Sequence, residues 1–344
     1  MREASGQRPP VRGTPAGGDD AAPLGPDQVT AWREQGAVVV FDLVPADLVA
    51  AARANALAAA PPFERGAAGD FGMAGFVFPA ECAAFNSVTL HPRLLAAVAQ
   101  LLGVELAEVR LSQSDLWIKH GRPRSTDDPF DNDDQRIHVD YPNHTLVHPP
   151  EWDSPEAVEV IIYADRVDDC DGANRVVLRE GPDDPAYAYP IVATPGVGAH
   201  AWMNARAAVE AHFAEVAPEI SAFRSALYSR ERAVDYDNAT VLLYRHDTWH
   251  RGTPVRPGAT RVVHNLTFRR SDAEWISTLH EGWAWSMYRR SQVMERLVAT
   301  ATVEQRCVLG FPRPGHRYWT PSTLATVEAR YGPFGFDSSP YRDW

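Results

Sequence analysis

The chain has 344 residues, of which 45% are hydrophobic, and it carries a formal net charge of −12, so it can bury a substantial core. The acidic balance disfavours nucleic acid as a partner, because phosphate binding needs a basic surface. The sequence contains neither a signal-peptide pattern nor a run of about 18 apolar residues, so we expect no membrane association.

The three cysteines bear on the cellular compartment. Cys82, Cys170 and Cys307 are too few and too scattered for a disulfide framework or a thiolate zinc site. We therefore expect a cytoplasmic protein, because the cytoplasm keeps thiols reduced. The sequence does not indicate the oligomeric state.

The first third of the chain is predicted to be mainly helical. Residues 1–25 are rich in Gly, Pro and Ala, so we expect a disordered leader, followed by a single domain over 26–344. The stretch 27–44 predicts a short helix that runs into a β-strand. The Ala-rich stretch 45–60 predicts a second helix, and 91–103 predicts another, which opens at a proline and ends at a glycine.

From residue 109 the hydrophobic pattern changes to that of short strands. Five segments are rich in β-branched and aromatic residues and are bounded by Pro, Gly, Asp or Asn. They are "VRLSQSDLWIKH" (109–120), "RIHVDYPNHTLV" (136–147), "AVEVIIYADRV" (157–167), "ATVLLYRHDTWH" (239–250) and "TRVVHNLTFRR" (260–270).

Helical patterns interrupt and follow these strands. A helical insertion at about 204–235 contains two amphipathic helices, and 320–332 predicts a helix near the C-terminus. Helices that flank a run of short strands predict one α+β domain, built on a barrel or on a double-sheet jelly roll.

Three residues on two of the predicted strands indicate a metal site. His138 and Asp140 are two residues apart, so in an extended segment their side chains share one face, and His250 ends a later strand. Two histidines and one carboxylate form the facial triad of non-haem iron(II) oxygenases. Such a triad leaves three positions for a chelating 2-oxo acid and dioxygen. The alternative is a surface hydrogen bond between His138 and Asp140.

A fourth residue extends this pattern. Arg261 follows His250 by eleven positions and begins the next strand. Its guanidinium could form a bidentate pair with the distal carboxylate of a chelated 2-oxo acid. The alternative is a surface ion pair, which is common for an Arg at the start of a strand.

With these four residues the sequence resembles the phytanoyl-CoA dioxygenase family of iron(II)/2-oxoglutarate-dependent oxygenases. The resemblance runs from about residue 27 to the C-terminus and includes "HVD" at Asp140, "DRVDDCDGANRVV" and "WHRGTPVRPGATR". It implies a double-stranded β-helix (jelly roll) core flanked by helices, in which His138, Asp140 and His250 bind Fe(II) and Arg261 binds 2-oxoglutarate, with dioxygen as the third reactant.

Further side chains are candidates for contact with the 2-oxo acid or the substrate. Gln113 and Lys119 share one face of the first strand with Trp117, and Tyr163 lies on the third strand. Each could equally belong to the core or the rim. The same two interpretations apply to Asn265, Thr267, Trp249, the acidic stretch 127–134, and the remaining histidines His120, His144, His148, His246 and His264.

The sequence thus predicts a non-haem Fe(II)/2-oxoglutarate-dependent dioxygenase that hydroxylates a C–H bond of a small organic substrate. Desaturation and ring formation remain open as outcomes of the same chemistry. One alternative is a cupin-like metal enzyme that uses no 2-oxo acid. Arg261 is the feature that distinguishes the dioxygenase from this alternative, because such an enzyme has no distal carboxylate to bind. Another is a non-catalytic jelly-roll binding protein, against which the intact His138, Asp140 and His250 argue.

Overall fold

The structure is a computed structural model. The residues it describes are 8–17, 19–60, 73–122, 134–141, 152–188, 191, 193–194, 205–273, 293–309 and, near the C-terminus, 311, 313–316, 319, 321, 324, 327 and 331–342.

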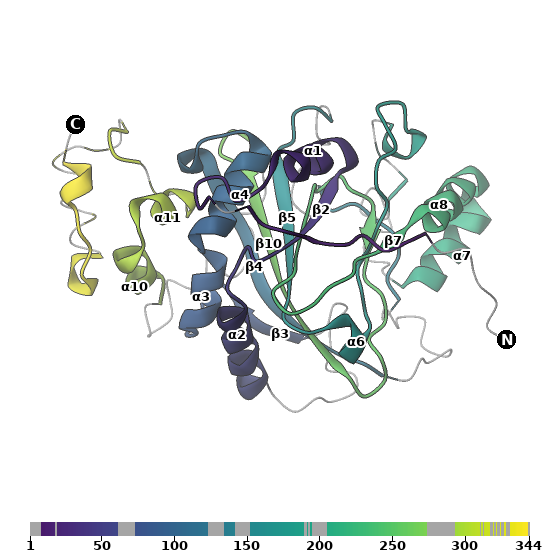
Figure 1. The fold of residues 1–344 in the computed structure, drawn as a ribbon, viewed down its shortest axis with the longest axis horizontal. Helices are drawn as coiled ribbons and strands as arrows, with labels where there is room; N and C mark the ends of the chain where they lie inside the picture. Colours follow the sequence, from purple (N-terminus) through teal and green to yellow (C-terminus); the bar gives the residue numbers. More distant parts are fainter. Residues whose placement is uncertain are drawn as a thin grey trace.

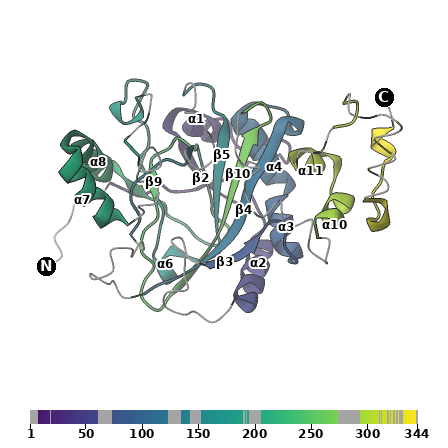
Figure 2. The same cartoon turned by 180° about the vertical axis from the view of Figure 1, so that it is seen from behind.

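Two β-sheets form the centre of the molecule (Figures 1 and 2). The larger sheet has the strand order β1-β2-β8-β5-β10-β4-β3, and the smaller has the order β7-β6-β9. The strands of the larger sheet are β1 (Thr14–Pro15), β2 (Ala37–Phe41), β3 (Met73–Val77), β4 (Val109–His120), β5 (Ala157–Tyr163), β8 (Val241–Tyr244) and β10 (Thr260–Arg270). Those of the smaller sheet are β6 (Arg175–Val176), β7 (Arg232–Ala233) and β9 (His250–Arg251).

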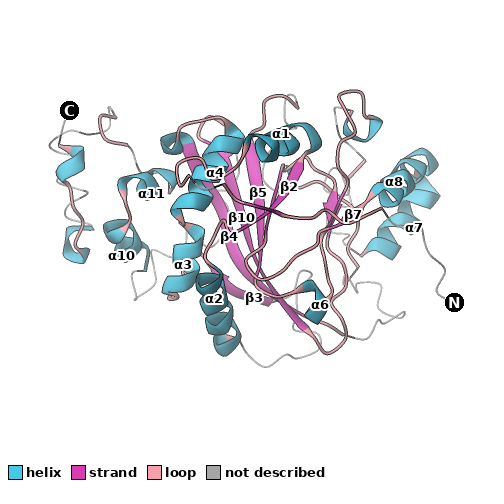
Figure 3. Cartoon of the chain, viewed as in Figure 1, coloured by secondary structure: helices cyan, strands magenta, loops and turns pink. Residues whose placement is uncertain are grey.

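Helices cover one face of the larger sheet and lie at both ends of the molecule, as Figure 3 shows. The α-helices are α1 (Pro26–Gln35), α2 (Ala46–Ala59), α3 (Ala83–Thr89), α4 (Pro92–Leu102), α6 (Val167–Cys170), α7 (Arg206–Val216), α8 (Pro218–Arg230), α10 (Val293–Thr300) and α11 (Val303–Val308). Short 3-10 helices are η1 (Leu106–Glu108), η2 (Pro185–Tyr187), η4 (Gly332–Phe334) and η5 (Ser339–Tyr341). The pair α7–α8 lies at the opposite end of the molecule from α10 and α11 (Figure 1).

The register of the larger sheet separates two faces. β10 pairs antiparallel with β4 and β5, so that Val263 lies opposite Trp117 on one side and Tyr163 on the other. Because side chains alternate along a strand, Val263 and Tyr163 point to one face, whereas Val262 points to the other. The second face packs against α1–α4 in the main core, and the first packs against β6 in the smaller sheet. The two sheets therefore enclose an inner layer, which includes Tyr163 and Val176.

Several sequence predictions are confirmed. The strands over 109–120 and 260–270 coincide with β4 and β10, and the helix predicted over 91–103 is α4. Gly103 ends α4 in the left-handed conformation (φ 68°), which glycine adopts without a steric penalty. The insertion contains α7 and α8 as expected. Sheets combined with flanking helices make this an α+β fold.

Two strand predictions were too long. The segment 239–250 is divided into β8 and β9 by a tight turn, in which the amide of Thr248 donates to the carbonyl of Arg245. The segment 157–167 ends as a strand at Tyr163, and α6 begins at Val167. Helix and strand boundaries depend on such local turns, which hydrophobic periodicity does not report.

The strand predicted over 136–147 is wrong in its described part, 136–141. This part is bridged to β9 only through His138 and His250, and the amide of Asp140 donates to the carbonyl of His246. Chain direction changes there, so a continuous ladder cannot form. The rest of this prediction lies outside the described residues.

The predicted leader is also partly wrong. Thr14–Pro15 pair in parallel with β2, and the amide of Val11 donates to the carbonyl of Ala233. The exposed edge of β2 offers backbone hydrogen bonds that low hydrophobicity does not reveal. The helix predicted over 320–332 lies largely outside the described residues, and so does its N-terminal residue. Within the part of the chain that is described, no helix is long and apolar enough to cross a membrane.

Candidate metal site

His138, Asp140 and His250 come together as the sequence predicts. One ligand atom from each side chain lies within 4.8 Å of the other two. Nε2 of His138 is 3.4 Å from Oδ1 of Asp140, and Nε2 of His250 is 3.2 Å from Oδ2 of the same carboxylate. All three side chains are nearly or fully buried. The donor set is therefore preformed.

The backbone holds the two imidazoles in place. His138 and His250 exchange two backbone hydrogen bonds, with N···O distances of 2.9 Å and 2.8 Å. Their rings lie side by side, with centroids 4.3 Å apart. This single bridge places two ligands from distant parts of the sequence next to each other.

Hydrogen bonds also select which nitrogen faces the site. Nδ1 of His138 lies 3.0 Å from the carbonyl of Arg136, and Nδ1 of His250 lies 3.0 Å from the carbonyl of Thr248. Since a carbonyl only accepts, each Nδ1 carries a hydrogen, and Nε2 is the nitrogen of each ring that faces Asp140. This is the arrangement in which metal-bound histidines are held.

The charges of the site suit a divalent cation. Burial, followed by the charge of His250, lowers the pKa of His138 to about 4, so this imidazole is neutral at pH 7. Burial alone would raise the pKa of Asp140, but His250 and His138 outweigh it and hold the pKa well below its usual value. The site therefore combines a neutral imidazole with a carboxylate that stays ionised.

Tyr244 is a site residue that the sequence did not reveal. Its hydroxyl donates to Oδ2 of Asp140 over 2.9 Å, and its ring lies 4.7 Å from that of His250. It is the last residue of β8, six positions before His250. A tyrosine at the end of a buried strand is common core material, so only its contact with Asp140 marks it.

Three of the four candidates for binding the cosubstrate lie near one end of the inner layer. Arg261 lies directly opposite Lys119 in the β4–β10 register, and both are buried. Arg261 Nη1 donates to the carbonyl of Gly172, and its Nε has no hydrogen-bond partner among the described residues. Tyr163 lies on the same face and donates to Oδ1 of Asn174 over 2.9 Å. Two buried cations on adjacent strands make this end of the layer favourable for an anion.

Gln113 lies at the other end. It is opposite Thr267, six residues along β10 from Arg261, which corresponds to about 20 Å of strand. Gln113 donates to Asp115 over 2.8 Å, and the Thr267 hydroxyl donates to Glu159. Burial, followed by the charge of Asp140, raises the pKa of Glu159 well above its usual value. Gln113 is thus far from Arg261 and Lys119, and it belongs to a separate polar cluster with Asp115, Thr267 and Glu159.

Other candidates have structural contacts. His264 faces the helices, where its Nε2 lies 2.8 Å from Ser114 Oγ and its ring stacks on Phe85. His120 contacts the Thr260 hydroxyl, and Trp249 donates to the carbonyl of Ala186. Asn265 lies opposite Asp115 in the inner layer, and the side chain of Asp134 pairs with Arg251. His246 lies buried in the turn before β9. His144, His148 and 127–133 lie outside the described residues.

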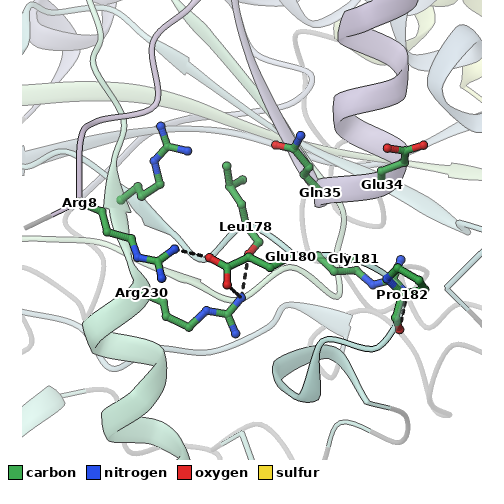
Figure 4. A pocket seen from close by; sticks show the side chains of 10 residues that line it. Arg8, Glu34, Gln35, Leu178, Glu180, Gly181, Pro182 and Arg230 are labelled. Carbon is green, nitrogen blue, oxygen red and sulfur yellow. Dashed lines mark hydrogen bonds and ion pairs between the residues drawn. The ribbon is translucent and has the colours of Figure 1, made fainter.

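A cavity of about 660 Å³ lies between the end of α1, the segment 178–182 and the end of α8 (Figure 4). Arg8 and Arg230 both reach Glu180 from one side, and Glu34 and Gln35 at the end of α1 lie on the other. None of His138, Asp140 and His250 lines it. Its lining includes surface ion pairs and has no feature of the candidate metal site.

No family model and no curated protein matches this chain, but solved structures match it. The crystal structure of the non-heme alpha-ketoglutarate-dependent carbocyclase SnoK from nogalamycin biosynthesis aligns with a TM-score of 0.51 and 17% identity, over 78% of this chain and 92% of that chain. The epimerase SnoN aligns with a TM-score of 0.45 and 14% identity, over 71% and 80%. EctD from S. alaskensis aligns with a TM-score of 0.44 and 17% identity, over 76% and 82%. At this identity the likeness to SnoK concerns the fold alone.

Proposed function

We propose that this chain is a non-haem Fe(II)/2-oxoglutarate-dependent dioxygenase that hydroxylates a C–H bond of a small organic substrate. The observation that carries the proposal is the preformed triad: His138, Asp140 and His250 place three ligand atoms within 4.8 Å of one another, and both Nδ1 atoms are already bonded to carbonyls. This donor set is the one that non-haem iron(II) oxygenases use. The SnoK fold similarity supports the same class.

We also propose that the two sheets form a double-stranded β-helix of the phytanoyl-CoA dioxygenase type. The strands β8, β5, β10 and β4 are adjacent and antiparallel in the larger sheet. The smaller sheet is extended beyond β9 by the bridge between His250 and His138. Two four-membered layers of this kind, closed over one inner layer, match the eight strands of a jelly roll.

In this proposal Arg261 and Lys119 hold the distal carboxylate of 2-oxoglutarate. Val176 is the β-partner of His250, and Gly172 is the hydrogen-bond partner of Arg261. These two positions are four residues apart, so His250 and Arg261 both contact the same short segment of the inner layer. The unpartnered Nε of Arg261 is a donor for the distal carboxylate.

Iron(II) and 2-oxoglutarate, when bound, would supply the oxidising chemistry, and the protein's own residues hold and orient the reactants. Asp140 contributes the only negative charge of the triad, and Tyr244 fixes its orientation through the hydrogen bond to Oδ2. The substrate would approach from the opposite end of the inner layer, where Gln113, Thr267 and Glu159 offer hydrogen-bonding groups.

The test is formation of succinate from 2-oxoglutarate by the purified protein with Fe(II) and dioxygen, compared with His138→Ala and His250→Ala. We expect succinate from the parent protein and none above background from either variant, with far-UV circular dichroism unchanged. Succinate formation at the parent rate by His250→Ala would exclude the proposal. Mass spectrometry of a metabolite pool, incubated with the active enzyme, would then identify the substrate.

A further inference from the structure

The segment that carries His138 has an outer edge that no strand covers among the described residues. The backbone N–H and C=O of His138 point to His250, so those of the preceding residue, Ile137, point the opposite way. Ile137 is fully buried. A buried backbone group without a partner costs about 1–3 kcal/mol in general, so this edge needs hydrogen-bond partners.

Side chains of α8 bond to both groups. The Tyr228 hydroxyl oxygen accepts from the amide of Ile137 over 3.0 Å, and Arg224 Nη2 donates to its carbonyl over 2.9 Å. Arg224 has no exposed surface, and its Nη1 donates to the carbonyl of Ala193 over 2.8 Å. The helix thus takes the place that a neighbouring β-strand would occupy.

Glu210 on α7 fixes these two side chains in orientation. It accepts from Arg224 Nη2 over 2.6 Å and from the Tyr228 hydroxyl over 2.7 Å. Because Tyr228 gives its hydrogen to Glu210, its oxygen presents a lone pair to Ile137. The carboxylate also neutralises the buried guanidinium, which would otherwise be costly to bury. The side chains of Glu210, Arg224 and Tyr228 therefore all take part in hydrogen bonds of this cluster.

We infer that Glu210, Arg224 and Tyr228, here called the Ile137 clamp, are positioning residues for the metal ligand His138. The inference rests on the proposed function, in which His138 binds iron. The Ile137 clamp bonds to the backbone of Ile137, which directly precedes His138 in the sequence. The residue before Ile137 is Arg136, whose carbonyl orients the His138 ring. Metal–ligand distances tolerate only about 0.2 Å of deviation, so a small shift of this segment changes affinity. The α7–α8 insertion thereby acts on the metal centre from the side opposite the bridge to His250.

The test measures Co(II) binding to the metal-free full-length protein by calorimetry and by its visible absorption spectrum, with Tm recorded for each variant. Tyr228→Phe keeps the ring but removes the acceptor for Ile137, and Arg224→Lys keeps the charge but loses the fork of donors. Val209→Ala is the control, because it removes buried methyl groups from α7 and leaves the bonds to Ile137 in place.

We expect Tyr228→Phe and Arg224→Lys to weaken Co(II) binding about tenfold or more and to alter the Co(II) spectrum, as loss of outer-shell partners does at metal sites. Val209→Ala should lower Tm and bind Co(II) as the parent protein does. Parent-like binding and spectra in Tyr228→Phe would overturn the inference, and so would an equal loss in Val209→Ala. If Arg224→Lys does not fold, Tyr228→Phe decides alone. A parent protein that binds no Co(II) would instead refute the proposed metal site itself.

Discussion

Tyr244 donates its hydroxyl hydrogen to Oδ2 of Asp140 over 2.9 Å, from the end of a strand that lies beside the triad. The same Oδ2 lies 3.2 Å from Nε2 of His250. One carboxylate oxygen is thus oriented by a phenol from one side while it faces the ligand atoms of the candidate metal site on the other.

This contact predicts that Tyr244→Phe weakens metal binding without abolishing it. Loss of a hydrogen bond to a metal-binding carboxylate costs about tenfold to a hundredfold in affinity, because the ligand loses its preferred orientation. Anaerobic titration with Fe(II) measures the change. Tyr236→Phe is a matched control, because Tyr236 is also a buried tyrosine but donates to the carbonyl of Asp171. Equal affinities in Tyr244→Phe and the parent protein would contradict the role of Tyr244.

Arg261→Gln should weaken 2-oxoglutarate binding much more than iron binding. A charge-assisted hydrogen bond contributes about 1.5–3 kcal/mol, so the apparent affinity for 2-oxoglutarate should fall by roughly tenfold to a hundredfold or more. A shorter 2-oxo acid without the distal carboxylate should show little added loss in the variant. Paired anaerobic titrations with both acids provide the comparison. Equal weakening for the two acids would mean that Arg261 acts through the fold, and Lys119 would be the next residue to test.

Gly172→Ala should disturb the same anion site from the backbone. Gly172 has a φ of +74°, and a Cβ there would lie 2.9 Å from Val255 Cγ2 and 3.3 Å from Arg261 Nη1. The left-handed conformation alone costs about 1–2 kcal/mol for a residue with a side chain. We therefore expect a lower urea midpoint and weaker 2-oxoglutarate binding, with Fe(II) affinity close to that of the parent. Gly258→Ala is the control, because its φ is also positive (+81°) and no atom lies within 4 Å of its added Cβ. A Gly258→Ala protein that lost 2-oxoglutarate affinity equally would contradict this explanation.

Sequence reasoning located the triad because its spacing is a property of extended chains. His138 and Asp140 share a face whether the segment is a full strand or, as here, a short bridged stretch. The two long strands that carry Arg261 and Lys119 were also predicted with the correct boundaries, whereas the pairing of these two residues is seen only in the structure. The shared face and the two strands depend on local periodicity, which is present in the amino-acid order.

The contacts that complete the site depend on tertiary packing instead. Tyr244 reaches Asp140 across 104 positions of sequence, and Arg224 reaches Ile137 across 87. Neither residue type is unusual in a buried strand or helix, so no single-sequence signal marks them. The amphipathic pattern of 204–235 predicted two helices but could not show that their polar side chains would bond to the backbone of a distant segment.

Burial of His264 predicts a pH dependence of stability. Burial lowers its pKa to about 3, whereas the unfolded chain has the ordinary value of about 6.5. Between these values the unfolded state binds the additional proton, so this residue makes the free energy of unfolding fall as the pH falls from about 6.5 toward 3. The slope is at most about 1.4 kcal/mol per pH unit.

Urea unfolding of the parent protein and His264→Gln at several pH values isolates this contribution, since other acid-sensitive groups are common to both proteins. Glutamine can keep a hydrogen bond to Ser114 but does not titrate. We expect the stability difference between the parent and the variant to shrink steadily as the pH is lowered below about 6.5. A difference that is independent of pH would show that His264 is already accessible to protons in the folded protein.

The most direct test of the proposed function is the visible absorption spectrum of the anaerobic protein on stepwise addition of Fe(II) and then 2-oxoglutarate. A 2-oxo acid chelated to protein-bound Fe(II) gives a charge-transfer band that neither component gives alone. The account predicts this band in the parent protein, its loss in His250→Ala, and a higher 2-oxoglutarate requirement in Arg261→Gln. A parent protein that binds Fe(II) but shows no band at saturating 2-oxoglutarate would contradict the account.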